Sequence, residues 1–467
     1  MEDKTAGREE GNADDGRTPE DGAADRLAAK VRRDGKSGPF APAGRHSTGA
    51  SGWRVFLALL LAYALFAILL NSVGTVILQS IRYFGVAKTT ASTLEAFKDL
   101  SIAGVSFLVA AFLARFGYRR AMVIALAVVA AALFAMPLVD RFAMAQLLFL
   151  ATGASFAVIK VSTYATLGLL SANPRDHQFR MNLLEGVFML GVLAGYWIFG
   201  HFMGDTSADD PAWMNVYPWL GGAALAAAGL LLITPFPCRS PGPRETRRAA
   251  PMPARTAFGQ MWRLAIRPLT LIFVVSAFLY VLIEQAIGTW LPTFNREILG
   301  ISARTSVEVT SIFAAALAIG RIGAGVLLRR LRWYPLLMVA LALMAGLILL
   351  VLPLAGELAQ HDGARPFGLP IAAFLLPLVG LFMAPVYPAI NSAVLSSLPT
   401  DRQAAMTGLI VVFSALGGTT GSLITGFLFA HLNGIVAFYG TLVPIAGLAI
   451  ALTVFRRLLR DDHREDT

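Results

Sequence analysis

Twelve long apolar blocks constrain the fold of this chain more than any other feature of the sequence. Each holds about 20 residues, the length at which a helix crosses the hydrocarbon core of a bilayer. The stretch 56–70, FLALLLAYALFAILL, has no polar face, whereas a surface helix of a soluble protein carries one. Hydrophobic residues make up 56% of the chain and charged residues 15%, against about 25% charged in soluble domains. The sequence therefore predicts an all-α integral membrane protein with spans at 54–80, 93–115, 120–139, 143–170, 181–203, 216–235, 268–293, 306–328, 334–356, 369–397, 406–429 and 433–455.

Basic residues fall on every second expected loop, which predicts how the chain is oriented. The loop 236–267 contains seven arginines and one glutamate, while 204–213 on the opposite side is acidic. The positive-inside rule places both termini in the cytoplasm, and a bacterial inner membrane is the expected location. This placement assigns the net charge of +10 to topology and excludes a nucleic-acid partner. The expected organisation is a disordered cytoplasmic tail 1–52, a six-helix bundle 53–235, a basic linker 236–267, a second six-helix bundle 268–456 and a cytoplasmic tail 457–467.

Several functional classes lack their sequence signatures here. Cys238 is the single cysteine, so an internal disulfide framework is excluded. The histidines show no metal-ligand spacing, and no phosphate-binding Gly-x-x-x-x-Gly-Lys-Ser/Thr loop occurs. No nucleophile and base pattern is present either. We expect a protein that is not an enzyme, that needs no cofactor or metal, and that does not hydrolyse ATP.

The sequence contains an internal duplication. Residues 173–188, NPRDHQFRMNLLEGVF, match 398–413, LPTDRQAAMTGLIVVF, at seven of sixteen positions. Both copies join two successive apolar blocks, the fourth to the fifth and the tenth to the eleventh. Many transporters consist of two such parallel halves with the binding site between them at the membrane midplane. The repeat thus predicts two similar bundles of six helices.

This plan resembles the major facilitator superfamily. After the second span that family reads Gly-x-x-x-Asp-Arg-x-Gly-Arg-Arg, and residues 110–120 here read AAFLARFGYRR. The basic part is kept in Arg115, Gly117, Arg119 and Arg120, while Ala110 and Ala114 stand where the family has Gly and Asp. The resemblance implies twelve transmembrane helices in two pseudo-symmetric six-helix bundles and a gating role for Arg115. Within the superfamily, 278–294 and 380–394 resemble the fucose–galactose–glucose proton symporter group. That likeness implies a sugar as solute.

Two ionisable residues lie deep inside predicted spans, where charged groups are costly and usually functional. Lys160 is near the middle of the span 143–170, and the equivalent position of the other half is Pro385. It is predicted to bind the solute or to interact with a carboxylate whose protonation drives transport; a permanent buried ion pair is the alternative. Glu284, inside the span 268–293, is the expected partner.

The resemblance implies that spans one, four, seven and ten line the central space. It brings polar residues of these spans to the same place as Lys160 and Glu284. Trp290 is a candidate to stack on a sugar ring, and an interfacial belt position is the alternative. The further candidates for solute binding are Asn71, Gln79, Gln285, Tyr387 and Asn391.

Three more ionisable residues are candidates for proton coupling or gating. Asp99 lies one turn beyond Glu95 and could share a proton with it or pair with the adjacent Lys98. Glu95 itself, at its spacing from Ser92, is explained by a helix-capping box. Glu185 is expected to form a gate salt bridge on the cytoplasmic side with Arg180 or Arg175. Arg321 lies within the span 306–328 and must be paired or face water.

These observations favour a secondary active transporter for a small polar solute, a sugar by resemblance, with proton coupling through Glu284 or Asp99. Its expected partners are the solute, the proton and the lipid bilayer, and a monomer is the expected state. The cation at Lys160 leaves open an organic anion or sugar acid as the solute. A drug/proton antiporter is a further alternative, as is a transporter-like sensor without flux.

Overall fold

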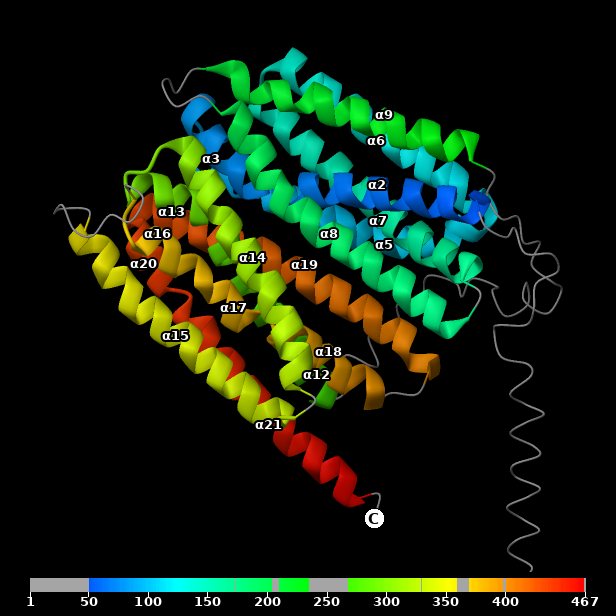
Figure 1. The fold of residues 1–467 in the computed structure, drawn as a ribbon. Coiled ribbons are helices and arrows are strands. Elements are labelled where there is room, and N and C mark those ends of the chain that lie inside the picture. The colour runs from blue at the N-terminus through cyan, green and yellow to red at the C-terminus, as the bar shows by residue number, and fades with distance from the viewer. Residues whose placement is uncertain are drawn as a thin grey trace, which may run out of the picture.

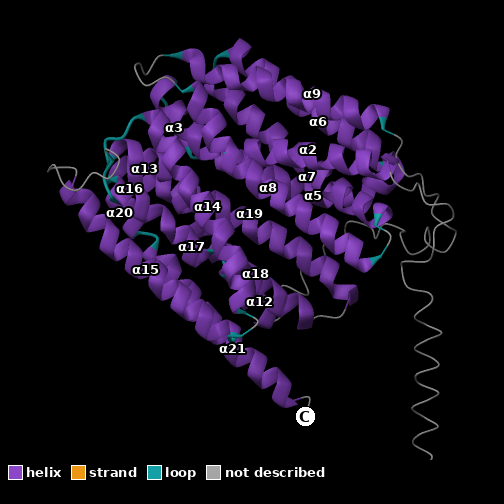
Figure 2. Ribbon diagram, viewed as in Figure 1, coloured by secondary structure: helices purple, strands orange, loops and turns teal. Residues whose placement is uncertain are grey.

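A computed structural model describes residues 50–171, 173–203, 210–234, 268–328, 330–358, 369–397 and 400–465. Within these ranges the regular structure is helical throughout (Figure 2). Eleven of the helices are long and apolar enough to cross a membrane. The expected second span corresponds to α5 (Thr93–Phe116), in which the side chains of 107–115 lie outside the described part. Residues 1–49 of the predicted tail 1–52 and the whole predicted linker 236–267 also lie outside the described residues.

The first half of the chain forms one group of packed helices (Figure 1). Within it α5 packs on α7, α6 on α7 and α9, and α2 on α8. Gly117 links α5 to α6 with φ 89°, a backbone conformation that side chains with a Cβ rarely adopt. The elements are α2 (Ala50–Asn71), α3 (Val73–Tyr83), α4 (Lys88–Ala91), α5, α6 (Tyr118–Val139), α7 (Phe142–Leu170), α8 (Pro174–Phe202), η2 (Pro211–Asn215) and α9 (Val216–Ile233).

The second half forms a similar group, with α12 packed on α19 and α21, and α17 on α14 and α15. The expected span 369–397 is divided into short pieces, because Pro377 and Pro385 cannot donate backbone hydrogen bonds. The elements are α12 (Pro268–Gly288), α13 (Leu291–Glu297), α14 (Ala303–Leu327), α15 (Trp333–Leu358), α16 (Ala372–Leu375), η4 (Leu376–Leu378), α17 (Val379–Met383), α18 (Val386–Ser397), α19 (Thr400–His431), α20 (Gly434–Tyr439) and α21 (Leu442–Glu465).

The outer surface of both halves is apolar. Leu138, Ile233 and Val443 are each at least 75% exposed, and Trp219 and Ile322 nearly as much. Large apolar patches on this scale are not left in water, but they suit contact with lipid tails. The described structure therefore confirms the predicted membrane-spanning helical fold.

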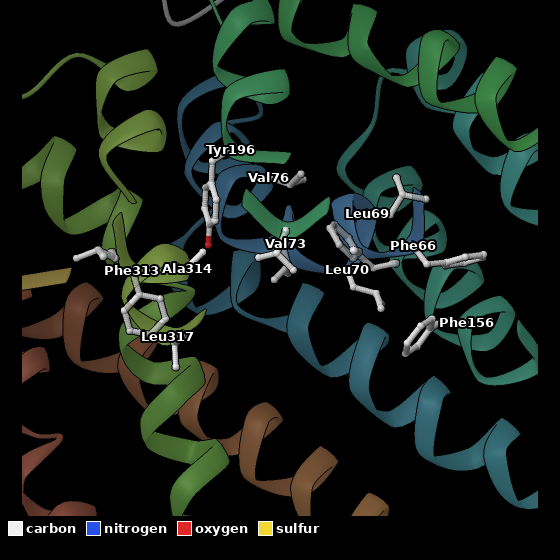
Figure 3. Packing of buried hydrophobic residues seen from close by; sticks show 14 of the residues in the cluster. Phe66, Leu69, Leu70, Val73, Val76, Phe156, Tyr196, Phe313, Ala314 and Leu317 are labelled. Atoms are coloured by element: carbon white, nitrogen blue, oxygen red, sulfur yellow. The ribbon is translucent and has the colours of Figure 1, made fainter. Parts of the chain in front are cut away.

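The two halves meet through equivalent helices. The second span of the first half, α5, packs on the fifth span of the second half, α19, and α8 packs on α14. Figure 3 shows Tyr196 of α8 pointing toward Ala314 of α14. The broken first spans also touch, since a Cβ added at Gly74 of α3 would lie 2.4 Å from the carbonyl oxygen of Thr289. We call the region around Lys88, Ser92, Asp99, Thr289 and Gly418 the contact end.

Candidate functional site

Glu284 and Arg321 form an ion pair between two helices of the second half. The Arg321 Nη2 atom lies 3.8 Å from Glu284 Oε1, and the side chains are 35% and 22% exposed. Arg321 also reaches the first half, because its Nη1 lies 3.7 Å from the Met189 sulfur on α8. Arg321 is therefore paired, which is one of the two situations expected for a guanidinium inside a span. The expected pair between Glu284 and Lys160 is not the one formed, because Arg321 on the neighbouring helix reaches Glu284 first.

Lys160 of α7 is exposed. Its ammonium lies 5.8 Å from the ring centre of Phe156 and 6.0 Å from that of Tyr164. Both distances allow a cation–π interaction. Its electrostatic neighbour is Glu185 on α8. The amine of Lys160 is therefore accessible and has no close ion-pair partner among the described residues.

Glu185 has a different partner from the one expected from its neighbours in the sequence. Its Oε1 accepts a hydrogen bond of 2.7 Å from the Tyr164 hydroxyl, and the Tyr63 hydroxyl lies 3.3 Å from that of Tyr164. Arg180 instead binds Asp176 at 3.0 Å, one helical turn earlier. The gate salt bridge expected between Glu185 and Arg180 is thus absent from the described structure, since an i,i+4 partner is nearer.

Four accessible or half-buried charges alternate in sign across the two halves. Glu185 is within electrostatic reach of Lys160 on one side and of Arg321 on the other, and Arg321 pairs with Glu284. The formal charges therefore alternate from helix to helix: positive on α7 (Lys160), negative on α8 (Glu185), positive on α14 (Arg321) and negative on α12 (Glu284). We call these four residues the charge ring. Its formal charges cancel, so the ring as a whole does not require a charged ligand.

Polar atoms beside the charge ring lack hydrogen-bond partners within the described residues. The Tyr280 hydroxyl interacts with Glu284 and Arg321 without reaching the geometry of a full hydrogen bond to either, and Arg321 Nε is unpaired among the described residues. Tyr387 stacks on Tyr280 with ring centres 5.2 Å apart, and Asn391, one turn further on α18, has a buried unpaired carboxamide oxygen. Buried polar groups are costly unless a partner is supplied. These atoms can bind a solute that both donates and accepts hydrogen bonds.

A second cluster of charges lies at the contact end, on α5. The Lys98 ammonium forms a salt bridge with Glu95 and lies 3.5 Å from Asp99 Oδ1, with all three side chains nearly buried. Ser92 caps α4 instead of starting α5, and its hydroxyl bonds to the Thr89 carbonyl. The capping box expected for Ser92 and Glu95 is therefore wrong. The sequence indicated Lys98 as a possible partner of Asp99, and the two groups do lie 3.5 Å apart, but neither Glu95 nor Lys98 was predicted to be a site residue.

The remaining predicted residues lie outside the charge ring. Gln285 accepts a hydrogen bond of 3.0 Å from the Thr289 hydroxyl, and Asn71 donates to the Ala67 carbonyl at 3.0 Å, where α2 ends. Trp290 is fully buried, stacked on Phe429, and donates to Ser422, so its ring is covered in this structure. This burial also contradicts a belt position. Gln79 is buried, and the side chain of Arg115 lies outside the described residues.

A more exposed ion pair joins the halves at the rim of the contact end. Lys88 Nζ lies 2.6 Å from Glu297 Oε2, and the side chains are 24% and 31% exposed. Pairs that reach solvent contribute about 0.2–1 kcal/mol. Replacing Lys88 with methionine is expected to change the transport rate less than about fivefold, a ratio that such an energy allows. A flux assay checks this, and a loss as large as that of a null variant would contradict it.

Comparison with known proteins gives a consistent picture. Residues 55–421 match the family model described as the Major Facilitator Superfamily. None of the curated proteins compared with the chain matches it. Among solved structures, a bacterial homologue of the human lysosomal transporter Spinster, in an inward-facing and occupied conformation, is 14% identical with a TM-score of 0.67, covering 88% of this chain and 98% of its own. The E. coli fucose:proton symporter FucP is 17% identical with a TM-score of 0.56, covering 87% and 99%.

A third similar structure is a D-xylose–proton symporter, 15% identical with a TM-score of 0.62, covering 87% of this chain and 97% of its own. At these identities the likeness concerns the fold. Together with the long apolar helices, the comparisons show a multi-pass membrane protein built like known transporters.

Proposed function

Because this chain belongs to the Major Facilitator Superfamily, we propose that it is a secondary active transporter that moves a small polar solute, a sugar as the favoured class, driven by protons. The two halves alternately open the site to each side of the membrane. In the described structure they touch at the contact end, while Lys160 and Glu185 are exposed. The basic segment 115–120 lies at the other end of α5, so the positive-inside rule places the exposed site toward the cytoplasm.

The observation that carries this proposal is the set of unpaired polar atoms beside a charge-balanced ring. Tyr280, Arg321 and Asn391 offer both donors and an acceptor. A sugar hydroxyl donates and accepts, so it can satisfy these atoms without adding charge. The fucose and D-xylose symporters among the similar structures support the same solute class.

Glu284 is proposed as the group that takes up and releases the proton. It is half-buried and paired with Arg321, and the Arg321 contact with Met189 links the pair to the other half. Protonation would release Arg321 from its partner and change the attraction between the halves. Asp99 is the second candidate, since it lies at the contact between α5 and α19.

An organic anion is the alternative solute, and one observation favours it. Lys160 is accessible and has no close ion-pair partner among the described residues, so a carboxylate of a sugar acid could bind there. The drug/proton antiporter and the sensor without flux find no comparable support in the site.

The test of the proposal is uptake into reconstituted vesicles. Purified protein is placed in liposomes with an imposed pH gradient, and a panel of radiolabelled sugars and sugar acids is offered at equal concentration. We expect accumulation of at least one neutral sugar that disappears when the gradient is collapsed. Accumulation of sugar acids alone would support the anion alternative, and no accumulation from the panel would contradict the proposal.

Replacing Lys160 with methionine tests its role in binding. A hydrogen bond to a charged group contributes about 1.5–3 kcal/mol, so the solute concentration at half-maximal rate is expected to rise roughly tenfold or more. The maximal rate should change less. Lys160→Arg is the matched control, because it keeps the charge near Phe156 and Tyr164. If the solute concentration at half-maximal rate were unchanged in Lys160→Met, Lys160 would not be part of the binding site.

A further inference from the structure

Lys98 is a buried ammonium at the contact between the two halves. Its side chain is 6% exposed, and those of Glu95 and Asp99 are 0% and 11% exposed. The ammonium pairs with Glu95 and lies 3.5 Å from Asp99 Oδ1. Carboxylates buried to this extent are strongly destabilising unless a positive charge compensates them. Within the cluster the single ammonium of Lys98 faces two carboxylates, so it compensates one of their two negative charges.

Groups of the second half complete the surroundings of this cluster. The Thr289 hydroxyl, in the turn just after α12, lies 3.2 Å from Glu95 Oε2 and 3.0 Å from Gln285 Oε1, so its proton is shared between two acceptors. On α19, Gly418 leaves room for Asp99, since a Cβ there would lie 2.2 Å from Asp99 Oδ2. The Asp99 carboxylate therefore packs against the backbone of the opposite half.

The charges that face the cluster are predominantly negative. Glu95 and Asp99 lie on the same helix as Lys98, and Glu284 of α12 is within electrostatic reach of all three. Tyr196 of α8 faces Lys98 and Glu95 as a neutral hydroxyl group. The helices α7 and α19 contribute the glycines Gly153 and Gly418, which carry no charge. Arg321 is the partner of Glu284 and leaves the two α5 carboxylates to Lys98.

We infer that Lys98 acts as a built-in cation that allows the contact end to close. Without its ammonium, a cation from solution would have to bind at the same place. Closing this end then requires the uptake of at most one cation or proton at α5, because Lys98 already compensates one of the two carboxylates there. The inference rests on the proposed alternation of a transporter between two states. It concerns the closing step alone and does not depend on the identity of the solute.

The experiment measures closure directly, without solute. Spin labels are attached at Arg141→Cys and Leu432→Cys, two exposed positions on opposite halves near the contact end, in a Cys238→Ser background. Distance distributions are recorded in lipid nanodiscs at about pH 9 and about pH 5.5, on either side of the range in which perturbed carboxyl groups titrate. The ratio of the short to the long distance reports closed and open molecules.

The unsubstituted chain and Lys98→Arg are expected to close to the same extent as each other at each of the two pH values. In Lys98→Met the ratio of closed to open molecules should fall at least about tenfold at the higher pH and recover at the lower one, where protons neutralise the carboxylates. The neutral variant Lys98→Met/Glu95→Gln/Asp99→Asn should close at both. Closure of Lys98→Met at the higher pH would overturn the inference, and so would failure of the neutral variant to close, because packing and not charge would then be the cause.

Discussion

Replacing Glu284 with glutamine is expected to abolish accumulation of solute against its gradient while solute exchange across the membrane continues. Glutamine keeps the shape of the side chain but cannot carry the charge that pairs with Arg321 at 3.8 Å. The site then binds solute in both states but takes up no proton on either side. Uptake driven by a pH gradient should fall to the level of empty vesicles, whereas exchange of labelled for unlabelled solute should persist.

A matched control exists on the same helix as Arg321. Glu308 pairs with Arg304 at 2.9 Å one turn apart, and the Arg304 side chain is exposed, so Glu308→Gln removes an ion pair far from the charge ring. Pairs of this type on a helix contribute about 0.3–0.5 kcal/mol. We expect Glu308→Gln to accumulate solute normally. Normal accumulation by Glu284→Gln as well would transfer the coupling role to Asp99 or another group.

Replacing Gly418 with alanine is expected to stop transport by holding the contact end apart. The added methyl group would lie 2.2 Å from Asp99 Oδ2 and 3.3 Å from Gln285 Cγ, distances shorter than ordinary packing allows. Overpacking costs about 1–3 kcal/mol, and moving Asp99 also disturbs its interaction with Lys98. The ratio of closed to open molecules should fall roughly tenfold or more. A flux assay measures the loss of transport, and the distance between spin labels at positions 141 and 432 measures the loss of the closed state.

Gly323→Ala on α14 is the control for this substitution. No atom lies within 4 Å of a Cβ added at Gly323, so the same change in side chain meets open space there. Gly74→Ala gives an independent second obstruction, since its Cβ would lie 2.4 Å from the Thr289 carbonyl oxygen across the same contact. If Gly418→Ala transported as well as Gly323→Ala, the contact between α5 and α19 would not be required for the cycle.

The two charge clusters have different relations to solvent, and this separates their proposed roles. The charge ring of Lys160, Glu185, Arg321 and Glu284 is accessible enough for a solute or a proton to reach it. The Lys98 cluster is nearly buried and is closed by Gly418 and Thr289 of the other half. A single chain can thus bind solute at one cluster and stabilise its closed end at the other.

Sequence reasoning singled out charged residues inside long apolar helices, but it predicted the partners of several of them poorly. Glu284, Arg321 and Asp99 stood out because charges inside apolar blocks are rare. Their expected partners were wrong where a neighbour on another helix lay nearer, as Arg321 does to Glu284. Trp290 was expected near a sugar, but its burial depends on Phe429 and Ser422, which lie more than 130 residues away along the chain. The opposite error affected Glu95, which a local capping pattern explained too easily.

The sequence by itself determined the membrane-spanning helices, their duplication and the family. The length of each apolar segment and the spacing of the repeat depend only on the order of residues along the chain. The tertiary structure alone decided which charges face one another. Pairing depends on the rotation and close approach of helices from different parts of the chain, and glycines such as Gly418 and Gly74 permit that approach. Helix rotation is set by packing across both halves, so no local pattern could have assigned Lys98 to the contact end or Arg321 to Glu284.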